Sequence, residues 1–295
     1  MMDFSTLSSG KLVRMARMAF EHGPGDGKLL ILPIDQGVEH GPVDFLSNPD
    51  SANPKYQFEM ALRGDYSAIA VHIGLAVKYH SEFAGLVPLV LKINGKTNIP
   101  SDENAFSPLT ATVEDAVRLG ADAVGYTLYA GSPRQDDDIE QLCHVRTECD
   151  RFGMPLIVWS YPRGAAVEKK GGKDSLYAID YAARLALELG ADVIKLNYPK
   201  LVYGKGEPEK YTNLETDEIK AMERLVISAG NAGVIVSGGS KISDEQLLDK
   251  VSNSLRAGVM GLIFGRNMWQ RPMEEALELT EKIHQKINEA SGVTG

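Results

Sequence analysis

The sequence predicts a (β/α)8 TIM barrel, an α/β fold, formed by residues 1–295 as a single domain with an N-terminal helical extension at residues 1–27. Three observations predict this fold. Short apolar runs alternate with longer amphipathic segments. One short motif that ends a helix and begins a strand occurs twice. No low-complexity linker divides the 295 residues, and this length suits one barrel because such domains commonly reach about 250 residues.

Eight apolar runs are the predicted strands. They are rich in Val, Ile and Leu and lack strict alternation, which is typical of parallel strands covered on both faces. Strands that alternate with helices favour a closed barrel, and an open doubly wound sheet is the alternative. The predicted strands are residues 29–35, 68–72, 87–93, 123–128, 156–161, 193–197, 234–237 and 261–265.

Amphipathic segments between these strands are the predicted helices, at residues 113–119, 135–151, 175–189, 216–229, 244–257 and 273–288. Asp174, Ser243 and Pro272 occupy positions typical of N-caps or first-turn residues. The recurring motif is Leu-Gly-Ala-Asp, at residues 119–122 and 189–192, where a helix ends at glycine and a buried strand follows. The polar stretch 200–213 is predicted to be a long loop, and the sequence leaves open whether it closes over a ligand.

Composition excludes several classes of function. The formal net charge of −9 predicts no general attraction for nucleic acid or anionic membranes. No apolar run reaches the roughly 18 residues of a membrane span, and residues 1–10 lack the features of a signal peptide. The two cysteines, Cys143 and Cys149, do not suit a disulfide framework or a zinc site, and the histidines form no metal-binding motif. We therefore expect a cytoplasmic protein that uses no metal or other cofactor.

Reactive side chains collect at the ends of the predicted strands, where (β/α)8 barrels place their catalytic residues. Lys195 is the most informative of them, because an apolar strand would bury its ammonium group. Burial that lowers a lysine pKa from about 10.4 toward 7 gives an amine nucleophile suited to Schiff-base chemistry. The alternative is a lysine whose stem is buried and whose amine reaches solvent. Asp35 and Tyr161 are candidate proton-transfer partners, and Lys92 lies in the third strand.

A phosphate site is predicted at the ends of the last two strands. Ser-Gly-Gly at residues 237–239 and Gly265 would let backbone N–H groups approach an anion, and Arg266 could bind it through two hydrogen bonds. In the alternative interpretation the glycines serve only turns. Arg163, after the fifth strand, could hold a second anion or form an ion pair.

Five segments together resemble the archaeal-type (DhnA-like) class I fructose-bisphosphate aldolases. They occur in the family's order along most of the chain. Each is weak alone, but the set is specific. The segments are Leu-Pro-Ile-Asp-Gln-Gly-Val-Glu-His-Gly-Pro at residues 32–42, Trp-Ser-Tyr-Pro-Arg-Gly at 159–164, Asp-Val-Ile-Lys at 192–195, Ser-Gly-Gly at 237–239 and Phe-Gly-Arg-Asn at 264–267. One departure is Gln36, where many archaeal members carry His and bacterial relatives carry Gln.

The resemblance implies a metal-independent, homo-oligomeric enzyme that cleaves or forms fructose 1,6-bisphosphate from dihydroxyacetone phosphate and glyceraldehyde 3-phosphate. It implies Lys195 as the Schiff-base lysine, Tyr161 as proton donor and acceptor, and Asp35 as an assistant in the carbinolamine and imine steps. The phosphate of the dihydroxyacetone end would contact Ser237, Gly238, Gly239, Gly265 and Arg266. The remaining substrate contacts would be Gln36, His40, Asp44, Trp159, Arg163 and Asn197, with Trp159 as a wall of the pocket.

Two kinds of alternative function stay open. Related lysine-dependent enzymes include a synthase that builds a dideoxy-heptulosonate from a sugar phosphate and aspartate semialdehyde, and a thiolase that acts on a phosphorylated pentanedione. Arg163 favours the aldolase over both, because it suits a second phosphate. A non-catalytic sugar-phosphate-binding protein would bind the ligand without a covalent adduct, and the combination of Asp35, Tyr161 and Lys195 argues against it.

Overall fold

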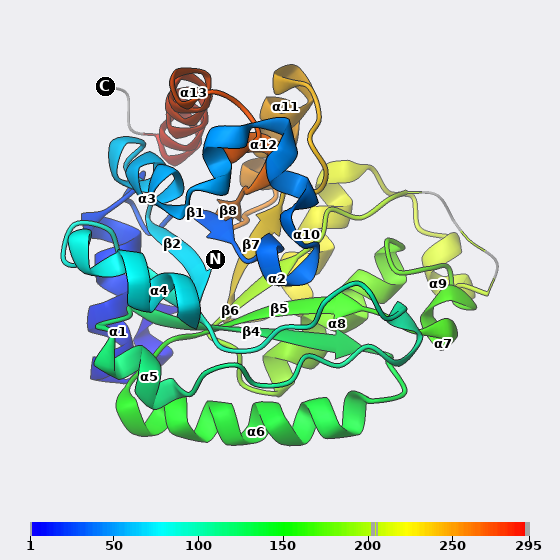
Figure 1. Ribbon diagram of the computed structural model, residues 1–295. Coiled ribbons are helices and arrows are strands. Elements are labelled where there is room, and N and C mark those ends of the chain that lie inside the picture. Colours follow the sequence, from blue (N-terminus) through cyan, green and yellow to red (C-terminus); the bar gives the residue numbers. More distant parts are fainter. Residues whose placement is uncertain (1, 202–203, 205, 293–295) are drawn as a thin grey trace.

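In the computed structural model, which describes residues 2–201, 204 and 206–292, eight parallel strands pair in chain order and the eighth returns to the first (Figure 1). The barrel is therefore closed, and the predicted (β/α)8 fold is confirmed. Parallel neighbours need a long crossover connection, which outer helices supply. The strands are β1 (Leu29–Ile34), β2 (Ala68–His72), β3 (Leu89–Lys92), β4 (Ala123–Ala130), β5 (Leu156–Pro162), β6 (Val193–Leu196), β7 (Gly233–Ser237) and β8 (Gly261–Ile263).

Helices cover the outside of the barrel. The predicted ones are present as α5 (Val113–Arg118), α6 (Gln135–Phe152), α8 (Leu176–Glu188), α10 (Glu218–Ser228), α11 (Asp244–Arg256) and α13 (Met273–Ser291). Other helices within the connections were not predicted, and four of them have only four residues, which leaves little periodicity to detect. They are α2 (Gln36–Glu39), α3 (Pro54–Arg63), α4 (Ile73–Tyr79), α7 (Ala165–Glu168), α9 (Glu209–Thr212) and α12 (Arg266–Trp269). The N-terminal segment, for which the sequence predicts a helical extension, contains α1 (Ser9–Ala16).

Two local expectations were wrong. Asp35 does not end β1 but occupies the N-cap position of α2, so the chain turns away from the barrel one residue earlier than predicted. The cap of α8 is Ser175, whose hydroxyl accepts a hydrogen bond from the Ala178 amide at 3.2 Å. Asp174 instead pairs with Lys200 at 2.7 Å.

The repeated Leu-Gly-Ala-Asp motif performs the same task twice. In each copy the helix ends and the glycine takes a left-handed φ, +69° at Gly120 and +93° at Gly190, which favours glycine. The aspartate that follows accepts a hydrogen bond from the first amide of the preceding strand. Asp122 accepts from Leu89 at 3.3 Å, and Asp192 accepts from Leu156 at 2.8 Å. The motif therefore joins β3 to β4 and β5 to β6 at the amino end of the barrel.

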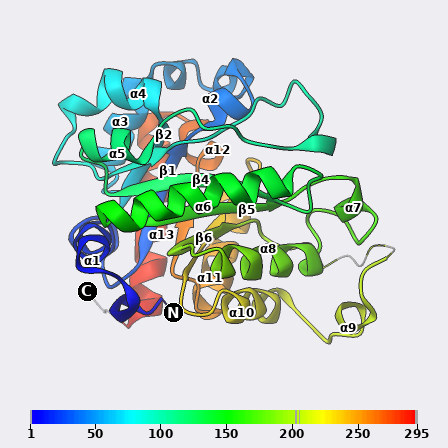
Figure 2. The same ribbon diagram turned by 90° about the horizontal axis from the view of Figure 1, so that it is seen from below.

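The apolar core has two layers. One fills the space between the strands and the outer helices. The other fills the barrel interior and continues into the N-terminal segment, where Met15, Met18 and Ala19 are fully buried. Two views show α1 at the end of the barrel opposite α7 and α9 (Figures 1 and 2). The N-terminal segment therefore closes the amino end of the barrel.

Ion pairs fix this segment in place. The Lys11 amine lies 2.9 Å from Asp192 and 2.8 Å from Asp150, and the Arg17 guanidinium lies 3.2 Å from Asp122. Both aspartates of the repeated motif thus also hold the N-terminal segment. In the part of the chain that the structure covers, no helix is both long enough and apolar enough to cross a membrane.

The predicted loop at residues 200–213 includes one short helix, α9. Residues 202, 203 and 205 lie outside the described residues. The sequence left open whether this segment closes over a ligand, and part of the segment falls on these positions.

Candidate active site

A cavity of about 700 Å³ lies at the carboxyl ends of the strands. It is lined by every predicted site residue except Asp44 and Trp159. Those lining residues are Asp35, Gln36, His40, Tyr161, Arg163, Lys195, Asn197, Ser237, Gly238, Gly239, Gly265 and Arg266. They come from connections and strands far apart in the sequence, so the closed barrel is what brings them together.

Lys195 of β6 is the buried amine of this cavity. Its side chain is 7% exposed, and its amine donates a hydrogen bond to the phenol oxygen of Tyr161 in the neighbouring strand. Burial lowers the pKa of Lys195 to about 8; the carboxyls of Asp35 and Glu39 oppose this shift, whereas Lys92 and Arg266 reinforce it. With this pKa, about one amine in ten is neutral at pH 7, against fewer than about one in a thousand for an ordinary lysine.

Tyr161 of β5 is a protonated phenol at rest. Burial raises its pKa well above the usual value, and the nearby carboxyls of Glu39 and Asp35 raise it further. The guanidinium of Arg163 acts in the opposite direction and lies 5.3 Å from the centre of the Tyr161 ring. The phenol is thus placed to exchange a proton with a group bound at Lys195, once a positive charge forms there.

Two charged residues at the centre of the site had no predicted role. Lys92 of β3 is fully buried, with its amine 3.5 Å from Glu39, 3.9 Å from Asp35 and 3.1 Å from the Asn94 carbonyl. Burial and the charge of Asp35 raise the pKa of Glu39, while Lys92 and Lys195 lower it. A lysine within an apolar strand is the signal that could have identified Lys92. Glu39 is brought in by the single turn of α2, which the sequence did not predict.

One end of the cavity offers donors for an anion. Gly265 has no room for a side chain, since an added Cβ would lie 2.9 Å from the Gln36 amide nitrogen and 3.0 Å from the Pro33 carbonyl. Gly239 has a φ of +70°. Arg266 follows Gly265 at the start of α12 and lines the same cavity. Glycine backbone and the Arg266 side chain therefore both line this end.

Arg163 lies on the loop after β5 and carries an ion pair. Its guanidinium is 3.0 Å from Asp102 and donates a hydrogen bond to the Pro162 carbonyl at 2.8 Å. Lys173, Lys200 and Lys250 line the cavity as well. Asp174, which pairs with Lys200 at 2.7 Å, and Glu218 line this rim too, so only part of its positive charge is free. A second anion would therefore find donors here, with Asp102 as a competitor for Arg163.

Two predicted contact residues, Asp44 and Trp159, do not line the cavity but lie next to side chains that do. The Asp44 carboxyl is hydrogen-bonded to the Nδ1 atom of His40, with 2.7 Å between the two atoms. It also lies 4.0 Å from the Arg266 guanidinium. Trp159 is fully buried, and its ring centre lies 5.4 Å from the Lys92 amine and 5.5 Å from the Lys195 amine. The expectation that Trp159 forms a wall of the pocket was wrong, because its position in β5 turns the indole inward beneath the two lysines.

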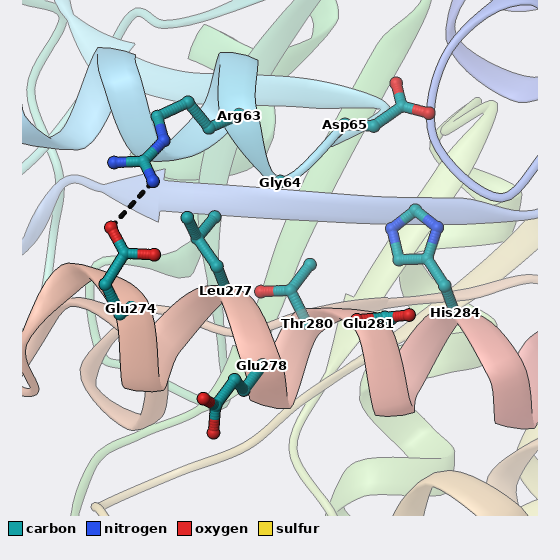
Figure 3. A pocket seen from close by; sticks show the side chains of 9 residues that line it. All are labelled: Arg63, Gly64, Asp65, Glu274, Leu277, Glu278, Thr280, Glu281 and His284. Carbon is teal, nitrogen blue, oxygen red and sulfur yellow. Dashed lines mark hydrogen bonds and ion pairs between the residues drawn. The ribbon is translucent and has the colours of Figure 1, made fainter.

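A smaller hollow, of about 430 Å³, lies away from this site between the end of α3 and helix α13 (Figure 3). An ion pair of 2.7 Å between Arg63 and Glu274 spans it. None of the predicted site residues lines it. The candidate active site is therefore the cavity that contains Lys195.

Comparison with known proteins agrees with this assignment. A family model described as "DeoC/LacD family aldolase" matches residues 29–271. The chain is 41% identical to a class 1 fructose-bisphosphate aldolase of Thermoproteus tenax over 88% of this chain and 90% of that protein. It is 38% identical to a protein of the same name from Halobacterium salinarum, over 92% of this chain and 98% of that protein.

A solved structure of an archaeal fructose-1,6-bisphosphate aldolase, with its catalytic Lys covalently bound to the carbinolamine intermediate of the substrate, has the same fold. Its sequence is 36% identical, the TM-score is 0.79, and the match covers 93% of this chain and 98% of that one. The extent of these matches, together with the closed barrel and the buried lysine, establishes the family. The chain belongs to the DeoC/LacD family of aldolases.

Proposed function

We propose that this protein is a class I fructose-bisphosphate aldolase, which cleaves fructose 1,6-bisphosphate into dihydroxyacetone phosphate and glyceraldehyde 3-phosphate and catalyses the reverse reaction. One observation carries the proposal: Lys195 is a buried amine with a pKa of about 8, in contact with a tyrosine phenol inside a cavity that Arg163 and Arg266 also line. The similarity to class 1 fructose-bisphosphate aldolases supports this substrate.

The reaction begins with attack of the neutral Lys195 amine on the C2 ketone. The carbinolamine that forms loses water to give an iminium ion, and Asp35, a buried carboxylate beside the site, shuttles the protons of these steps. As the C3–C4 bond breaks, the iminium accepts its electron pair and becomes an enamine. Protonation of the enamine and hydrolysis of the imine then release dihydroxyacetone phosphate and restore the amine.

Tyr161 acts on the C4 hydroxyl. The iminium charge on Lys195 stabilises the phenolate, and the nearby carboxyls of Asp35 and Glu39 can accept the phenol proton. The phenolate then takes the proton from the C4 hydroxyl as the C3–C4 bond breaks, so that glyceraldehyde 3-phosphate leaves as an aldehyde. No metal takes part in this sequence of steps, because the iminium itself stabilises the developing charge.

The two phosphates occupy opposite ends of the cavity. The phosphate next to C1 binds the glycine-rich end, at Ser237, Gly238, Gly239, Gly265 and Arg266. Gln36, His40, Asn197 and Arg163 contact the rest of the sugar, with Asp44 and Trp159 acting through the side chains that they touch. We further propose that the protein works in the cytoplasm as a homo-oligomer, and sedimentation of the purified protein tests the assembly.

Borohydride trapping tests the proposal. The protein is incubated with fructose 1,6-bisphosphate or dihydroxyacetone phosphate, reduced, digested and analysed by peptide mass spectrometry. We expect one reduced adduct, on Lys195, and no turnover in a folded Lys195→Met variant. Lys92→Met is the matched control, because it removes the other buried lysine of the site and should retain the adduct. Binding of either ligand without an adduct on Lys195 would identify a non-catalytic sugar-phosphate-binding protein.

A further inference from the structure

Arg163, at the rim of the active-site cavity, is paired with a carboxylate that is not part of the cavity lining. Its guanidinium lies 3.0 Å from Asp102, and the Lys96 amine lies 2.9 Å from the other oxygen of the same carboxylate. Asp102 begins a single 3-10 turn (η6, Asp102–Asn104) in the long connection between β3 and α5. The carboxylate therefore reaches the rim from a different connection than the arginine does.

Three cations act on the Asp102 carboxylate. Burial raises its pKa, but the hydrogen bond from Lys96 and the charges of Arg163, Lys96 and Lys173 together lower it more, so the net shift is downward. Asp102 is therefore ionised at pH 7 and cancels part of the surrounding positive charge. Arg163 and Lys173 both line the cavity, so the charge that Asp102 cancels is charge that an anion bound there would meet.

Other contacts hold Arg163 in position. Its guanidinium donates a hydrogen bond to the Pro162 carbonyl at 2.8 Å and lies 5.3 and 5.7 Å from the ring centres of Tyr161 and Tyr129. The Nε atom that faces Asp102 is close enough for an ion pair, but it makes no hydrogen bond to the carboxylate. Asp102 thus acts on Arg163 mainly as a negative charge and contributes little as an anchor.

A negative charge at this place weakens the binding of any anion at Arg163. The Coulomb energy between Asp102 and a bound group is proportional to the charge of that group. A neutral group is unaffected, and a group with two negative charges is weakened twice as much in free energy as a group with one. The connection between β3 and α5 therefore modulates how strongly the cavity holds the charged end of a ligand.

We propose that Asp102 is a specificity-determining residue of this site, an internal counter-ion of Arg163 that weakens the binding of the second substrate phosphate in proportion to its charge. The inference rests on the proposed function, and it takes Arg163 as a contact of that phosphate. A triose phosphate held by an arginine without a counter-ion would leave the cavity slowly, because tighter binding is expressed mostly in the dissociation rate. Asp102 offsets this attraction from outside the cavity.

Three acceptor aldehydes of different charge test the proposal, each condensed with dihydroxyacetone phosphate. Glyceraldehyde is neutral, succinic semialdehyde carries one negative charge, and glyceraldehyde 3-phosphate carries nearly two. For each aldehyde, kcat/KM of Asp102→Asn is divided by that of the wild-type protein, so its intrinsic reactivity cancels. The Asp102 side chain is 43% exposed, so a water-like medium applies. Over about 6 Å we then expect no change for glyceraldehyde, about a threefold gain for succinic semialdehyde and about a tenfold gain for glyceraldehyde 3-phosphate.

Two further variants serve as controls. Glu103→Gln removes the same formal charge from the next residue of η6, whose side chain is exposed, so it should change each of the three values less than about twofold. Asp102→Glu keeps the negative charge, so it should retain the low wild-type value for glyceraldehyde 3-phosphate. In Asp102→Asn itself, KM for dihydroxyacetone phosphate should stay within about twofold of the wild-type value, because that phosphate binds the opposite end of the cavity.

Several results overturn the proposal. A fall of all three values in Asp102→Asn would show that the residue only maintains the connection, and a fall for glyceraldehyde 3-phosphate alone would show that it positions Arg163. An unchanged value for glyceraldehyde 3-phosphate, or an equal gain in Glu103→Gln, overturns the proposal as well. Borohydride trapping at Lys195 of the wild-type protein separates this test from the proposed function. A missing adduct overturns both, whereas an adduct without any dependence on acceptor charge overturns only the role of Asp102.

Discussion

The reactivity of Lys195 depends on the charges that surround its amine. Burial alone favours the neutral form, and Lys92 adds a repulsive positive charge. Asp35 and Glu39 favour the ammonium form. Lys92 in turn lies within 4 Å of both carboxylates, so it weakens their effect on Lys195. The resulting pKa of about 8 leaves the lysine charged in most molecules at rest and neutral in enough of them to react.

Replacing Lys92 or Glu39 should therefore move the pH profile of imine formation in opposite directions. In the wild-type protein the rate should rise about tenfold per pH unit below pH 8 and level off above it. Lys92→Met removes a charge that lowers the pKa of Lys195, so the midpoint should move to higher pH. Glu39→Gln removes a charge that raises this pKa, so the midpoint should move to lower pH. Single-turnover trapping with borohydride across pH 6–10 measures both midpoints.

A purely structural role for these two residues gives a different result. Loss of packing would lower the amplitude of trapping in both variants but leave the midpoint near that of the wild-type protein. Midpoints that move in the same direction would contradict the electrostatic explanation.

Tyr161→Phe should separate the two halves of the reaction. The variant keeps the ring but loses the hydroxyl that we propose takes the C4 proton, so C3–C4 cleavage should slow by about a hundredfold or more. Imine formation, which we assign to Lys195 and Asp35, should fall far less. Stopped-flow measurement of glyceraldehyde 3-phosphate release, compared with borohydride trapping in the same protein, checks this. Equal losses in both steps would argue against the assigned role of Tyr161.

The candidate site could be predicted only in part from the sequence. Lys195 and Tyr161 stand out because a charged or reactive residue at the end of an apolar strand is unusual in a core. Glu39 could not be assigned, because its approach to Lys92 depends on the turn of α2 and on the distance between β1 and β3 across the barrel. Such distances are tertiary properties that strand periodicity does not contain.

At the scale of the elements, the strands were the most predictable part. Their ends lie within two residues of the predicted positions, because a run of buried apolar residues is a strong local signal. The helices α3 and α4 were missed, although α5, which was predicted, has only six residues. Pro54 and Gly74 lie in the first turns of α3 and α4, and both residue types usually indicate a turn. The N-cap of α8 was misplaced by one residue, because Ser175 and Asp174 are both good caps and only the path of the chain selects between them.

The N-terminal segment depends on one largely buried ion pair, so Lys11→Met should be costly. Asp192 would keep a carboxylate in a site where burial already raises its pKa and Lys11 opposes that shift. We expect the free energy of unfolding to fall by about 3 kcal/mol at pH 7. The loss should shrink as the pH falls toward 5, because protonation of Asp192 is then favoured in the folded state over the unfolded one. Urea denaturation at both pH values measures it.

Asp150→Ala is the matched control for this experiment. Asp150 is the other partner of Lys11, but its side chain is 58% exposed. Water and salt screen such a pair, so its removal should cost less than about 1 kcal/mol. Losses of equal size for the two variants would show that the buried Lys11–Asp192 pair contributes no more to the free energy of unfolding than the exposed Lys11–Asp150 pair.

At the scale of the whole molecule, the two ends of the barrel have separate tasks. The amino end is closed by Met15 and Met18, whereas the carboxyl end contains the cavity with Lys195. Met18→Ala should therefore lower the free energy of unfolding by about 3 kcal/mol, because it creates a cavity under the barrel. The turnover number and KM should change less than twofold well below the melting temperature. Thermal denaturation and steady-state kinetics of the same sample check both, and a large change in KM would contradict this separation.

Trp159 gives the enzyme an internal optical signal. It is one of only two tryptophans in the chain, and its indole lies at nearly the same distance from the amines of Lys92 and Lys195. Every change of charge on Lys195, from ammonium to amine to iminium, thus occurs 5.5 Å from the centre of a fluorescent ring. With Trp269 replaced by Phe, the fluorescence of Trp159 alone reports the individual covalent steps. Its intensity can be followed in real time, without a label and without stopping the reaction.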